Sequence, residues 1–225
     1  MNKVVFFDLD GTLVNSIGGI AASVNRTLAD YGFPALDEKL ILTYIGNGAR
    51  KLIERASAGL PLPVSIDEAK QTMVNYYNAY PLEKTSLYPG VAEGLQKLSA
   101  NGFYLVVVSN KPQTVADKIL SGLNVRDLFT ENIGDGSGFP LKPAPDAFQY
   151  FLGKHGINTS DAFMVGDNYT DIEAAANAGI RSVFCTYGYG KKRELPAFYD
   201  AADFSLVTDF ILKKHDFSGI SVKLI

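Results

Sequence analysis

The sequence predicts an α/β protein built on a doubly wound parallel sheet, with a separate helical insert near its amino-terminal end. Three observations support this fold class. Short, continuously apolar blocks recur along the chain, helical patterns alternate with them from about residue 87 onward, and residues 15–86 show helical periodicity alone after the first block. Continuous apolar runs are typical of parallel strands that helices cover on both faces. In such sheets, ligands bind at the carboxyl ends of the strands.

Four apolar blocks are expected to be buried strands, at residues 4–7, 103–108, 162–165 and 182–185. The segments between them carry apolar side chains at helical spacing. Val91, Leu95 and Leu98 show this pattern, and a later helical segment ends at Gly179, a residue type that often terminates helices. Strand and helix therefore alternate through the second half of the chain.

Residues 15–86 are expected to form an all-helical domain inserted between the core segments 1–14 and 87–225. Apolar residues at helical spacing mark four helices, over about residues 17–28, 40–45, 49–56 and 66–80, and prolines separate them. Because the insert follows the first strand, it would lie above the carboxyl ends of the sheet. We therefore expect it to act as a lid.

Composition excludes several classes of function. The chain has 225 residues, which suits one large domain or a large domain with a smaller companion. Hydrophobic residues make up 47% of it and the net charge is −3, which disfavours a general nucleic-acid binder. Its longest purely apolar run is six residues, far short of the roughly 18 that a membrane-spanning helix needs. Asp8 and Asp10 interrupt any secretory signal, and the single Cys185 cannot form an internal disulfide. We expect a cytoplasmic protein without membrane or nucleic-acid partners.

Two carboxylates follow the first strand. Strand alternation points Asp8 and Asp10 the same way, and Gly11 allows a sharp turn after them. Two acids this close resist joint ionisation unless a cation lies between them or one is protonated. A calcium loop is excluded, because Thr12 and Gly19 stand where such a loop needs acidic or amide ligands. An ordinary Asp-Gly turn remains an alternative for this motif alone.

A second acidic pair follows the strand at residues 162–165. Asp167 would lie at the strand tip, and Asp171 would lie at the start of the next helix, where capping alone could explain it. Neighbouring strand tips are about 5 Å apart, so Asp8, Asp10 and Asp167 could converge on one hard cation. Magnesium is the natural candidate.

The other strand exits carry groups that suit phosphate. Ser109 and Asn110 offer a hydroxyl and an amide, and Lys142 offers a positive charge that could neutralise both a phosphate and a nucleophilic carboxylate. Each piece has an ordinary explanation, since Ser-Asn often caps a helix and Lys-Pro is often a surface pair. The combination of all four pieces at successive strand exits favours a catalytic site.

These four pieces together resemble the four motifs of the haloacid dehalogenase superfamily of aspartate-based phosphatases, in the same order. The resemblance spans nearly the whole chain and implies a Rossmann-like core with a helical cap. Three further stretches are similar to phosphoglycolate phosphatases: residues 44–50 in the cap, residues 87–91 and residues 186–189. The chain departs from the commonest motifs at Asn15, where relatives often carry Asp, and at Leu141, where they often carry Lys.

The resemblance implies a role for each motif residue. Asp8 would attack phosphorus to form an aspartyl-phosphate, and Asp10 would protonate the leaving oxygen and later accept a proton from water. Mg²⁺ would be held by the Asp8 carboxylate, the Asp10 backbone carbonyl and the Asp167 carboxylate, with Asp171 in support. Lys142 would act in catalysis by holding the phosphoryl oxygens.

The substrate is expected to be a small phosphorylated metabolite, and 2-phosphoglycolate is the leading candidate. The protein is expected to be a monomer or a homodimer. The substrate-binding candidates are Thr12, Asn47, Arg50, Ser109 and Asn110. In the cap, an amide and a guanidinium suit a small carboxylate. The alternatives are a turn residue for Asn47 and an exposed helix charge for Arg50. The basic residues 191–193 receive no function, because a solvated cluster explains them.

Other functions remain open on the same scaffold. A dehalogenase or a phosphonate-cleaving enzyme generally lacks the acid at the position of Asp10, although Lys51 in the cap could form the Schiff base that the latter needs. A sugar-phosphate mutase typically carries a histidine in the first cap helix, and residues 17–28 contain none. A sugar-phosphate phosphatase, a nucleotide phosphatase and a phosphate-binding regulatory module are the remaining alternatives.

Overall fold

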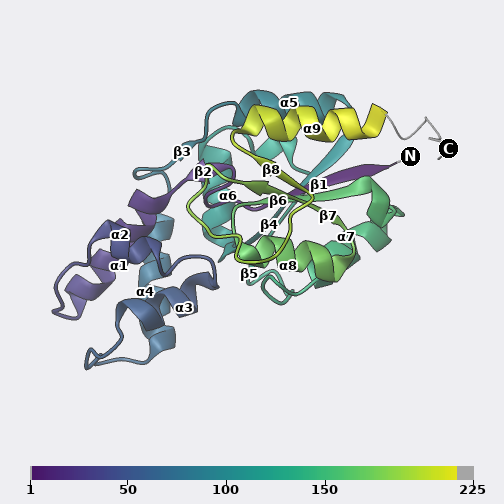
Figure 1. The fold of residues 1–225 in the computed structure, drawn as a ribbon. Helices are drawn as coiled ribbons and strands as arrows, with labels where there is room; N and C mark the ends of the chain where they lie inside the picture. The colour runs from purple at the N-terminus through teal and green to yellow at the C-terminus, as the bar shows by residue number, and fades with distance from the viewer. Residues whose placement is uncertain (1, 217–225) are drawn as a thin grey trace.

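The core of the protein is a six-stranded parallel sheet with the strand order β5-β4-β1-β6-β7-β8 (Figure 1). The structure is a computed structural model that describes residues 2–216, with side chains described through residue 214. The strands are β1 (Lys3–Phe7), β4 (Phe103–Pro112), β5 (Glu131–Asp135), β6 (Ala162–Gly166), β7 (Arg181–Cys185) and β8 (Tyr199–Ala201). Chain order runs outward from β1 through β4 and outward from β6 through β7, so the ligand-binding crevice of such a sheet lies where β1 meets β6.

Helices cover both faces of the sheet, as the continuous apolar strands predict. Val5 and Phe7 of β1 belong to one buried cluster, which includes residues of three core helices and of the helical insert. Val4 and Phe6 pack in a second cluster with residues of two other core helices. The first face is covered by α5 (Val91–Ala100), α6 (Gln113–Gly122) and α9 (Phe204–Asp216), and the second by α7 (Asp146–His155) and α8 (Tyr169–Ala178). Short 3₁₀ turns occur at Arg126–Leu128 and Thr159–Asp161. This arrangement confirms the predicted α/β fold class.

Two strands of the sheet were not predicted from the sequence. β5 has the sequence Glu-Asn-Ile-Gly-Asp, in which only Ile133 is a large apolar residue, and β8 is three residues long. Both are edge strands. Because an edge strand has one neighbour and is less enclosed, it needs no continuous apolar run.

The helical insert forms a body at one end of the sheet (Figure 1). Its helices are α1 (Ile17–Asp30), α2 (Glu38–Leu42), α3 (Gly48–Ala56) and α4 (Ile66–Ala79), with α1 and α3 both packed against α4. The two connections to the core are short antiparallel strands, β2 (Val14–Asn15) and β3 (Ser86–Leu87). The expected division of the chain at residues 14/15 and 86/87 falls within this ribbon.

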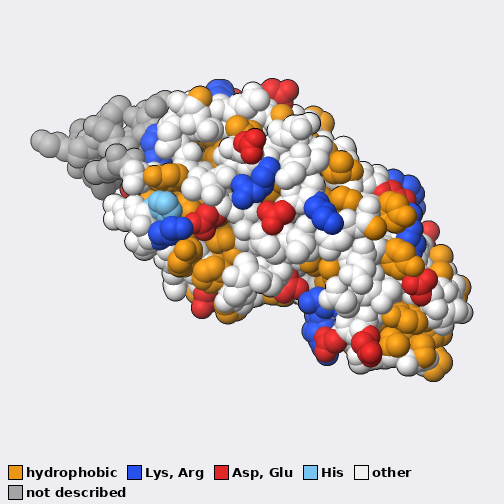
Figure 2. All heavy atoms as spheres, turned by 180° about the vertical axis from the view of Figure 1, so that it is seen from behind, with side chains coloured by type: hydrophobic (Ala, Val, Ile, Leu, Met, Phe, Trp, Pro, Cys, Tyr) orange, Lys and Arg blue, Asp and Glu red, His pale blue; other side chains and the backbone are white. Residues whose placement is uncertain are grey.

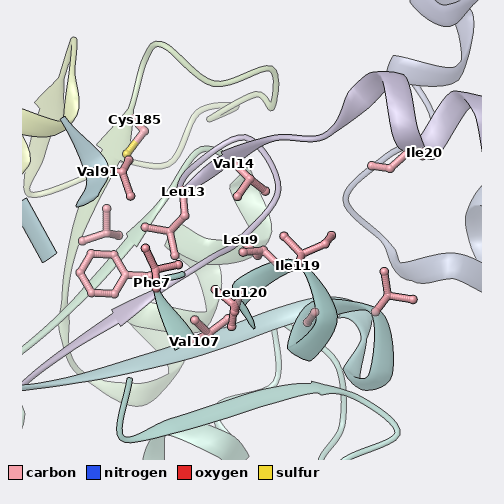
Figure 3. Packing of buried hydrophobic residues seen from close by; sticks show 14 of the residues in the cluster. Phe7, Leu9, Leu13, Val14, Ile20, Val91, Val107, Ile119, Leu120 and Cys185 are labelled. Carbon is pink, nitrogen blue, oxygen red and sulfur yellow. The ribbon is translucent and has the colours of Figure 1, made fainter. Parts of the chain in front are cut away.

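The loop that follows β1 is anchored by its own apolar side chains. Leu9, Leu13 and Val14 are fully buried, in the same cluster as Ile119 and Leu120 of α6 (Figure 3). Burying a leucine side chain stabilises the folded state by roughly 1.5–3 kcal/mol relative to exposing it. Three such anchors hold the acidic loop in a fixed position, because the acids alternate with residues that belong to the core.

The surface carries charges of both signs. On the face shown in Figure 2, the Lys and Arg side chains lie interspersed with Asp and Glu. Within residues 2–216, no helix combines the length and apolar character that crossing a bilayer requires.

Candidate active site

The strand register brings the acidic and polar segments together at one edge of the sheet. Phe7 pairs with Val107 on one side and Val165 on the other, so the residues that follow these three positions emerge side by side. They line one pocket, to which the core contributes Asp8, Asp10, Ser109, Asn110, Lys111, Pro112, Lys142, Asp167, Asn168, Thr170 and Tyr189. The helical insert closes the pocket with Ile20, Ile45, Gly46, Gly48, Ala49, Leu52, Met73 and Tyr77.

Three carboxylates form an acidic centre, and two of them, Asp8 and Asp167, line this pocket. Ligand oxygens of Asp8, Asp167 and Asp171 all lie within 4.8 Å of one another. Burial, together with the charges of the other two acids, raises the pKa of Asp167 well above its usual value. Burial also raises the pKa of Asp171, to about 6, although Lys142 opposes this effect. A cation among the three oxygens would relieve this repulsion, and carboxylate oxygens are the ligands that hard divalent cations prefer, so the residues present fit such an ion.

Lys142 is the counter-charge of the acidic centre. Its Nζ lies 2.9 Å from Asp8 Oδ1 and 2.7 Å from Asp171 Oδ1, and its side chain is only 2% exposed. Burial alone would lower the pKa of Lys142, but the two carboxylates outweigh it and the pKa is raised. The Asp8 Oδ1 atom is buried and has no well-directed hydrogen bond. Its charged neighbour is the Lys142 ammonium group at 2.9 Å.

Asp171 serves both of the roles that its sequence position suggested. Its Oδ2 accepts a hydrogen bond of 2.9 Å from the Asn168 N–H, which forms a capping box at the start of α8, while its Oδ1 meets Lys142. Gly166 is required beside it, because a Cβ at residue 166 would collide with the Asp171 carboxylate. The helix cap thereby fixes the position of the lysine.

Asp167 is held by the backbone of a neighbouring loop. Its Oδ2 accepts hydrogen bonds from the N–H groups of Tyr189 (3.0 Å) and Gly190 (2.7 Å). Thr12, expected to bind substrate, is fully buried instead, and its Oγ1 donates to Asp167 Oδ1 at 3.3 Å. Gly11 has φ 83°, and a Cβ there would collide with the Asp167 carboxylate, so the turn requires glycine for two reasons.

Asp10 lies between a hydroxyl and an ammonium group. Its Oδ1 accepts a 2.6 Å hydrogen bond from Ser16 Oγ, and both of its oxygens accept from Lys111 Nζ, at 2.8 and 2.9 Å. The Ser16 hydroxyl also contacts the Tyr189 hydroxyl at 3.1 Å. These contacts hold the Asp10 carboxylate in the lining of the pocket.

Asn110 and Ser109 both lie at the pocket, but the Asn110 amide is occupied by backbone groups. Its Oδ1 accepts from the Lys142 N–H at 2.8 Å, and its Nδ2 donates to the carbonyl oxygens of Lys142 (3.0 Å) and Gly46 (3.1 Å). This side chain positions the Lys142 segment and contacts the cap, whereas the sequence suggested a direct contact with phosphate. The Ser109 hydroxyl accepts from the Lys111 N–H at 3.3 Å.

The two cap candidates for substrate recognition do not line the pocket. Asn47 donates from Nδ2 to the Tyr169 hydroxyl at 2.7 Å, which joins the cap to the core. Arg50 is 50% exposed and pairs with Glu54 and Asp67. For Arg50 the reason is the helical period of α3, whose buried face is formed by other residues, Ala49, Leu52, Ile53 and Ala56.

Two other basic groups point away from the chemistry as well. Lys51 is 58% exposed and pairs with Glu54, so the structure does not place an amine from this position in the pocket for a Schiff base. In the basic cluster 191–193, Lys192 pairs with Asp200, and the guanidinium of Arg193 lies 3.3 Å from the centroid of the Tyr169 ring.

Lys111 lies inside the pocket with a side chain 2% exposed, although no role for it was predicted from the sequence. Its signal in the sequence was present: alternation along a strand puts Lys111 on the same side as Ser109. The Lys-Pro pair suggests a surface residue, and the groups that bury the lysine, Tyr77 and Asp10, come from distant segments.

Comparison with known proteins identifies the family. The model for haloacid dehalogenase-like hydrolases matches residues 5–185. A phosphoglycolate phosphatase of Mannheimia succiniciproducens is 41% identical over 194 residues, which cover 83% of this chain and 87% of that protein. One of Psychrobacter arcticus is 34% identical over 223 residues, covering 95% and 97%. A crystal structure of a predicted phosphoglycolate phosphatase from Haemophilus somnus 129pt has a TM-score of 0.85 and 34% identity, covering 93% of this chain and 97% of the other.

The chain therefore belongs to the haloacid dehalogenase-like hydrolase family. Within that family it is homologous to phosphoglycolate phosphatases over most of its length. Both conclusions confirm the resemblance drawn from the four motifs.

Proposed function

We propose that this protein is a magnesium-dependent phosphatase that hydrolyses a small phosphomonoester, 2-phosphoglycolate, through an aspartyl-phosphate on Asp8. The observation that carries the proposal is the Asp8 carboxylate itself. It lies at the convergence of Lys142, Asp167 and Asp171, with Asp10 in the same pocket. The choice of 2-phosphoglycolate is supported by homologues that bear the name of that activity.

The reaction occurs in two displacements. Asp8 attacks phosphorus, the bond from phosphorus to the ester oxygen breaks, and a proton from Asp10 neutralises the departing alkoxide. Asp10 then accepts a proton from water as the water oxygen attacks phosphorus, which releases phosphate and regenerates the Asp8 carboxylate. The proton that Asp10 gains in this step is the one that it gives to the next leaving group. Mg²⁺, held by the Asp8 and Asp167 carboxylates and the Asp10 carbonyl with Asp171 in support, would neutralise charge shared by nucleophile and phosphate.

The remaining core residues orient the phosphoryl group. Lys142 supplies a fixed positive charge beside Asp8, so it attracts the phosphoryl oxygens toward the nucleophile. The Ser109 hydroxyl lines the same pocket and can donate to one of those oxygens. Asn110 acts one step removed, by holding the Lys142 backbone in place.

The helical domain, residues 15–86, is proposed to be the cap that excludes bulk water and limits substrate size. The cavity between cap and core is small, about 60 Å³. Apart from Tyr77 and two glycines, the cap residues that line it are apolar, so they offer few partners to the hydroxyl groups of a sugar or nucleoside. This lining favours a small substrate over a sugar phosphate or a nucleotide.

The test is hydrolysis by the purified protein of a panel of phosphate esters: 2-phosphoglycolate, triose, sugar and nucleotide phosphates. We expect release of inorganic phosphate that requires Mg²⁺ and is fastest with 2-phosphoglycolate. Asp8→Asn should lower turnover by at least ~10³-fold, because it removes the nucleophile. Asp127→Asn, at an exposed site in the Arg126–Leu128 turn, is the matched control and should keep full activity.

Each alternative has its own outcome in this assay. Undiminished turnover by Asp8→Asn would refute the assigned nucleophile. Equal rates across the panel would refute the preference for 2-phosphoglycolate and leave the mechanism standing. Binding of phosphate without turnover would favour a regulatory module, and phosphoryl transfer between sugar carbons without phosphate release would favour a mutase.

A further inference from the structure

The pocket contains a second buried cation that the phosphoryl chemistry does not use. Lys111 Nζ lies 2.7 Å from the Tyr77 hydroxyl and 2.8 and 2.9 Å from the two oxygens of Asp10. Its ammonium group is also 4.1 Å from the centroid of the Tyr77 ring. Tyr77 belongs to α4 of the cap, whereas Lys111 lies on β4 of the core. The lysine therefore lies at the boundary between the two domains, inside the pocket.

The position of Lys111 corresponds to the leaving-group side of the proposed reaction. Asp10 protonates the departing oxygen, so the group attached to that oxygen must lie close to Asp10. In 2-phosphoglycolate, the carboxyl carbon is only two bonds from the ester oxygen. A cation that recognises this carboxylate must then be an immediate neighbour of Asp10, as Lys111 is.

Charge matching leaves few other candidates among the residues that line the pocket. The lining contains two cations: Lys142 lies between Asp8 and Asp171, on the side of the nucleophile, and Lys111 lies between Asp10 and Tyr77, on the side of the leaving group. The cap side contributes no charged residue to the lining, and Arg50 is directed outward. An anionic leaving group would thus find one cation on its own side of the pocket.

We propose that Lys111, oriented by Tyr77, is the specificity-determining residue that binds a carboxylate on the leaving group. The inference deepens the proposed phosphatase function and rests on it. An ammonium removed from water forms a short, charge-assisted hydrogen bond with a carboxylate, and the Tyr77 phenol can donate its own proton to a second oxygen. A neutral leaving group gains neither contact. Lys111 and Tyr77 therefore favour phosphate esters of small carboxylic acids over other small phosphate esters.

The experiment compares two substrates that differ in this one group: 2-phosphoglycolate, and ethyl phosphate, in which a methyl group replaces the carboxylate. The measured quantity is the ratio of their kcat/KM values. We expect Lys111→Met to lower this ratio by roughly 10- to 100-fold, the effect of losing a hydrogen bond between charged groups. Both substrates will also lose rate in common, because Lys111 contacts Asp10, and that common loss cancels in the ratio.

Two further variants sharpen the measurement. Tyr77→Phe keeps the ring and removes the hydroxyl, and should lower the ratio by a smaller factor, roughly 3- to 10-fold. Arg50→Gln removes a cation that lies outside the pocket, and should leave the ratio unchanged. A ratio that falls in Arg50→Gln and not in Lys111→Met would assign recognition to the cap guanidinium and overturn the inference.

The outcomes separate this inference from the proposed function. If the wild-type protein hydrolyses neither ester, the proposal that 2-phosphoglycolate is the substrate fails. If it hydrolyses both, but the ratio is unchanged in Lys111→Met and Tyr77→Phe, then Lys111 only positions Asp10 and the specificity role is overturned. If Lys111→Met does not fold by circular dichroism, Lys111→Gln and Tyr77→Phe decide the matter through competitive inhibition of ethyl phosphate hydrolysis by glycolate, which we expect both to weaken.

Discussion

Asp171 illustrates how one side chain at this site performs two tasks. One of its carboxylate oxygens caps α8, and the other binds the ammonium group of Lys142. Asp171 lies in the first turn of α8, so its bond to Lys142 ties the ammonium group to a rigid helix. A charge that acts on a phosphoryl group must be held in place to within a fraction of an ångström. A rigid helix can provide this precision through a residue that contacts the charged group.

Cys185 provides a test of burial at the level of a single residue. It is the one cysteine of the chain, is 1% exposed, and lies beside Val91 in the core (Figure 3). Burial raises the pKa of the thiol, so the folded protein holds it protonated at pH 8, and the stabilisation gained from this is lost only as the pH rises above the usual thiol range. Because the thiolate is the reactive form, we expect iodoacetamide at pH 8 to leave the native protein unlabelled and to label it fully in denaturant.

The measurement is the mass of the protein before and after treatment. A single cysteine makes the result unambiguous, since every added carbamidomethyl group reports on Cys185. Rapid labelling of the native protein would show that β7 opens to solvent and that the thiol is not held in the core.

At the scale of elements, the start of the cap helix α4 is stabilised by residues of its own sequence. α4 begins with a complete capping box, in which Ser65 Oγ accepts from the Glu68 N–H at 3.2 Å and Glu68 Oε2 accepts from the Ser65 N–H at 2.9 Å. Two of the unpaired donors at the start of the helix are satisfied in this way. The same helix carries Tyr77 into the pocket, so its stability bears on the site as well as on the cap.

Removal of this cap gives a prediction for α4. Ser65→Ala should lower the free energy of unfolding by about 1 kcal/mol, within the usual range for loss of a capping serine. Urea unfolding followed by circular dichroism measures it. Ser99→Ala, in the exposed last turn of α5, is the matched control and should change the stability little. A loss in Ser99→Ala as large as that in Ser65→Ala would contradict the capping explanation.

The elements also show where sequence reasoning succeeds and where it stops. The strands β1, β4, β6 and β7 are enclosed on both faces, so their burial appears in the sequence as unbroken apolar runs. β5, with Glu131 and Asp135 at its ends, carries no such run because it forms an edge. The burial of Lys111 was not predicted for a related reason. It depends on Tyr77, which contacts Lys111 only because the cap packs on the core.

The positions of the acidic residues were easier to predict than the contacts of the polar residues around them. Asp8 and Asp167 follow buried strands, and the parallel register then fixes their neighbourhood. Thr12 and Asn110 are also near the site, but the partners of their side chains depend on side-chain rotation, which strand periodicity does not determine. Local patterns therefore predict which segments meet, and three-dimensional packing decides which atoms meet.

At the scale of the whole molecule, the charged residues of the site lower the stability of the folded state. Asp8, Asp167 and Asp171 place three carboxylates together, and Lys142 supplies one positive charge among them. Buried charges without full compensation destabilise the folded state, which here must be offset by the two apolar clusters on either side of the sheet. A bound divalent cation would remove this destabilisation, since it binds the folded state and not the unfolded chain.

Thermal unfolding tests this relation in the protein as a whole. We expect Mg²⁺ at about 100 times its Kd to raise the Tm by roughly 5–10 °C, because that saturation stabilises by about 2.7 kcal/mol and a chain of this size gains about 2–4 °C per kcal/mol. Asp167→Asn should raise the Tm in chelator, because it removes a buried charge, and should lose most of the Mg²⁺ shift. Sodium chloride at equal ionic strength is the control for general screening. If Asp167→Asn keeps the full Mg²⁺ shift, the ion binds elsewhere, and the repulsion among the three carboxylates is relieved by a proton instead.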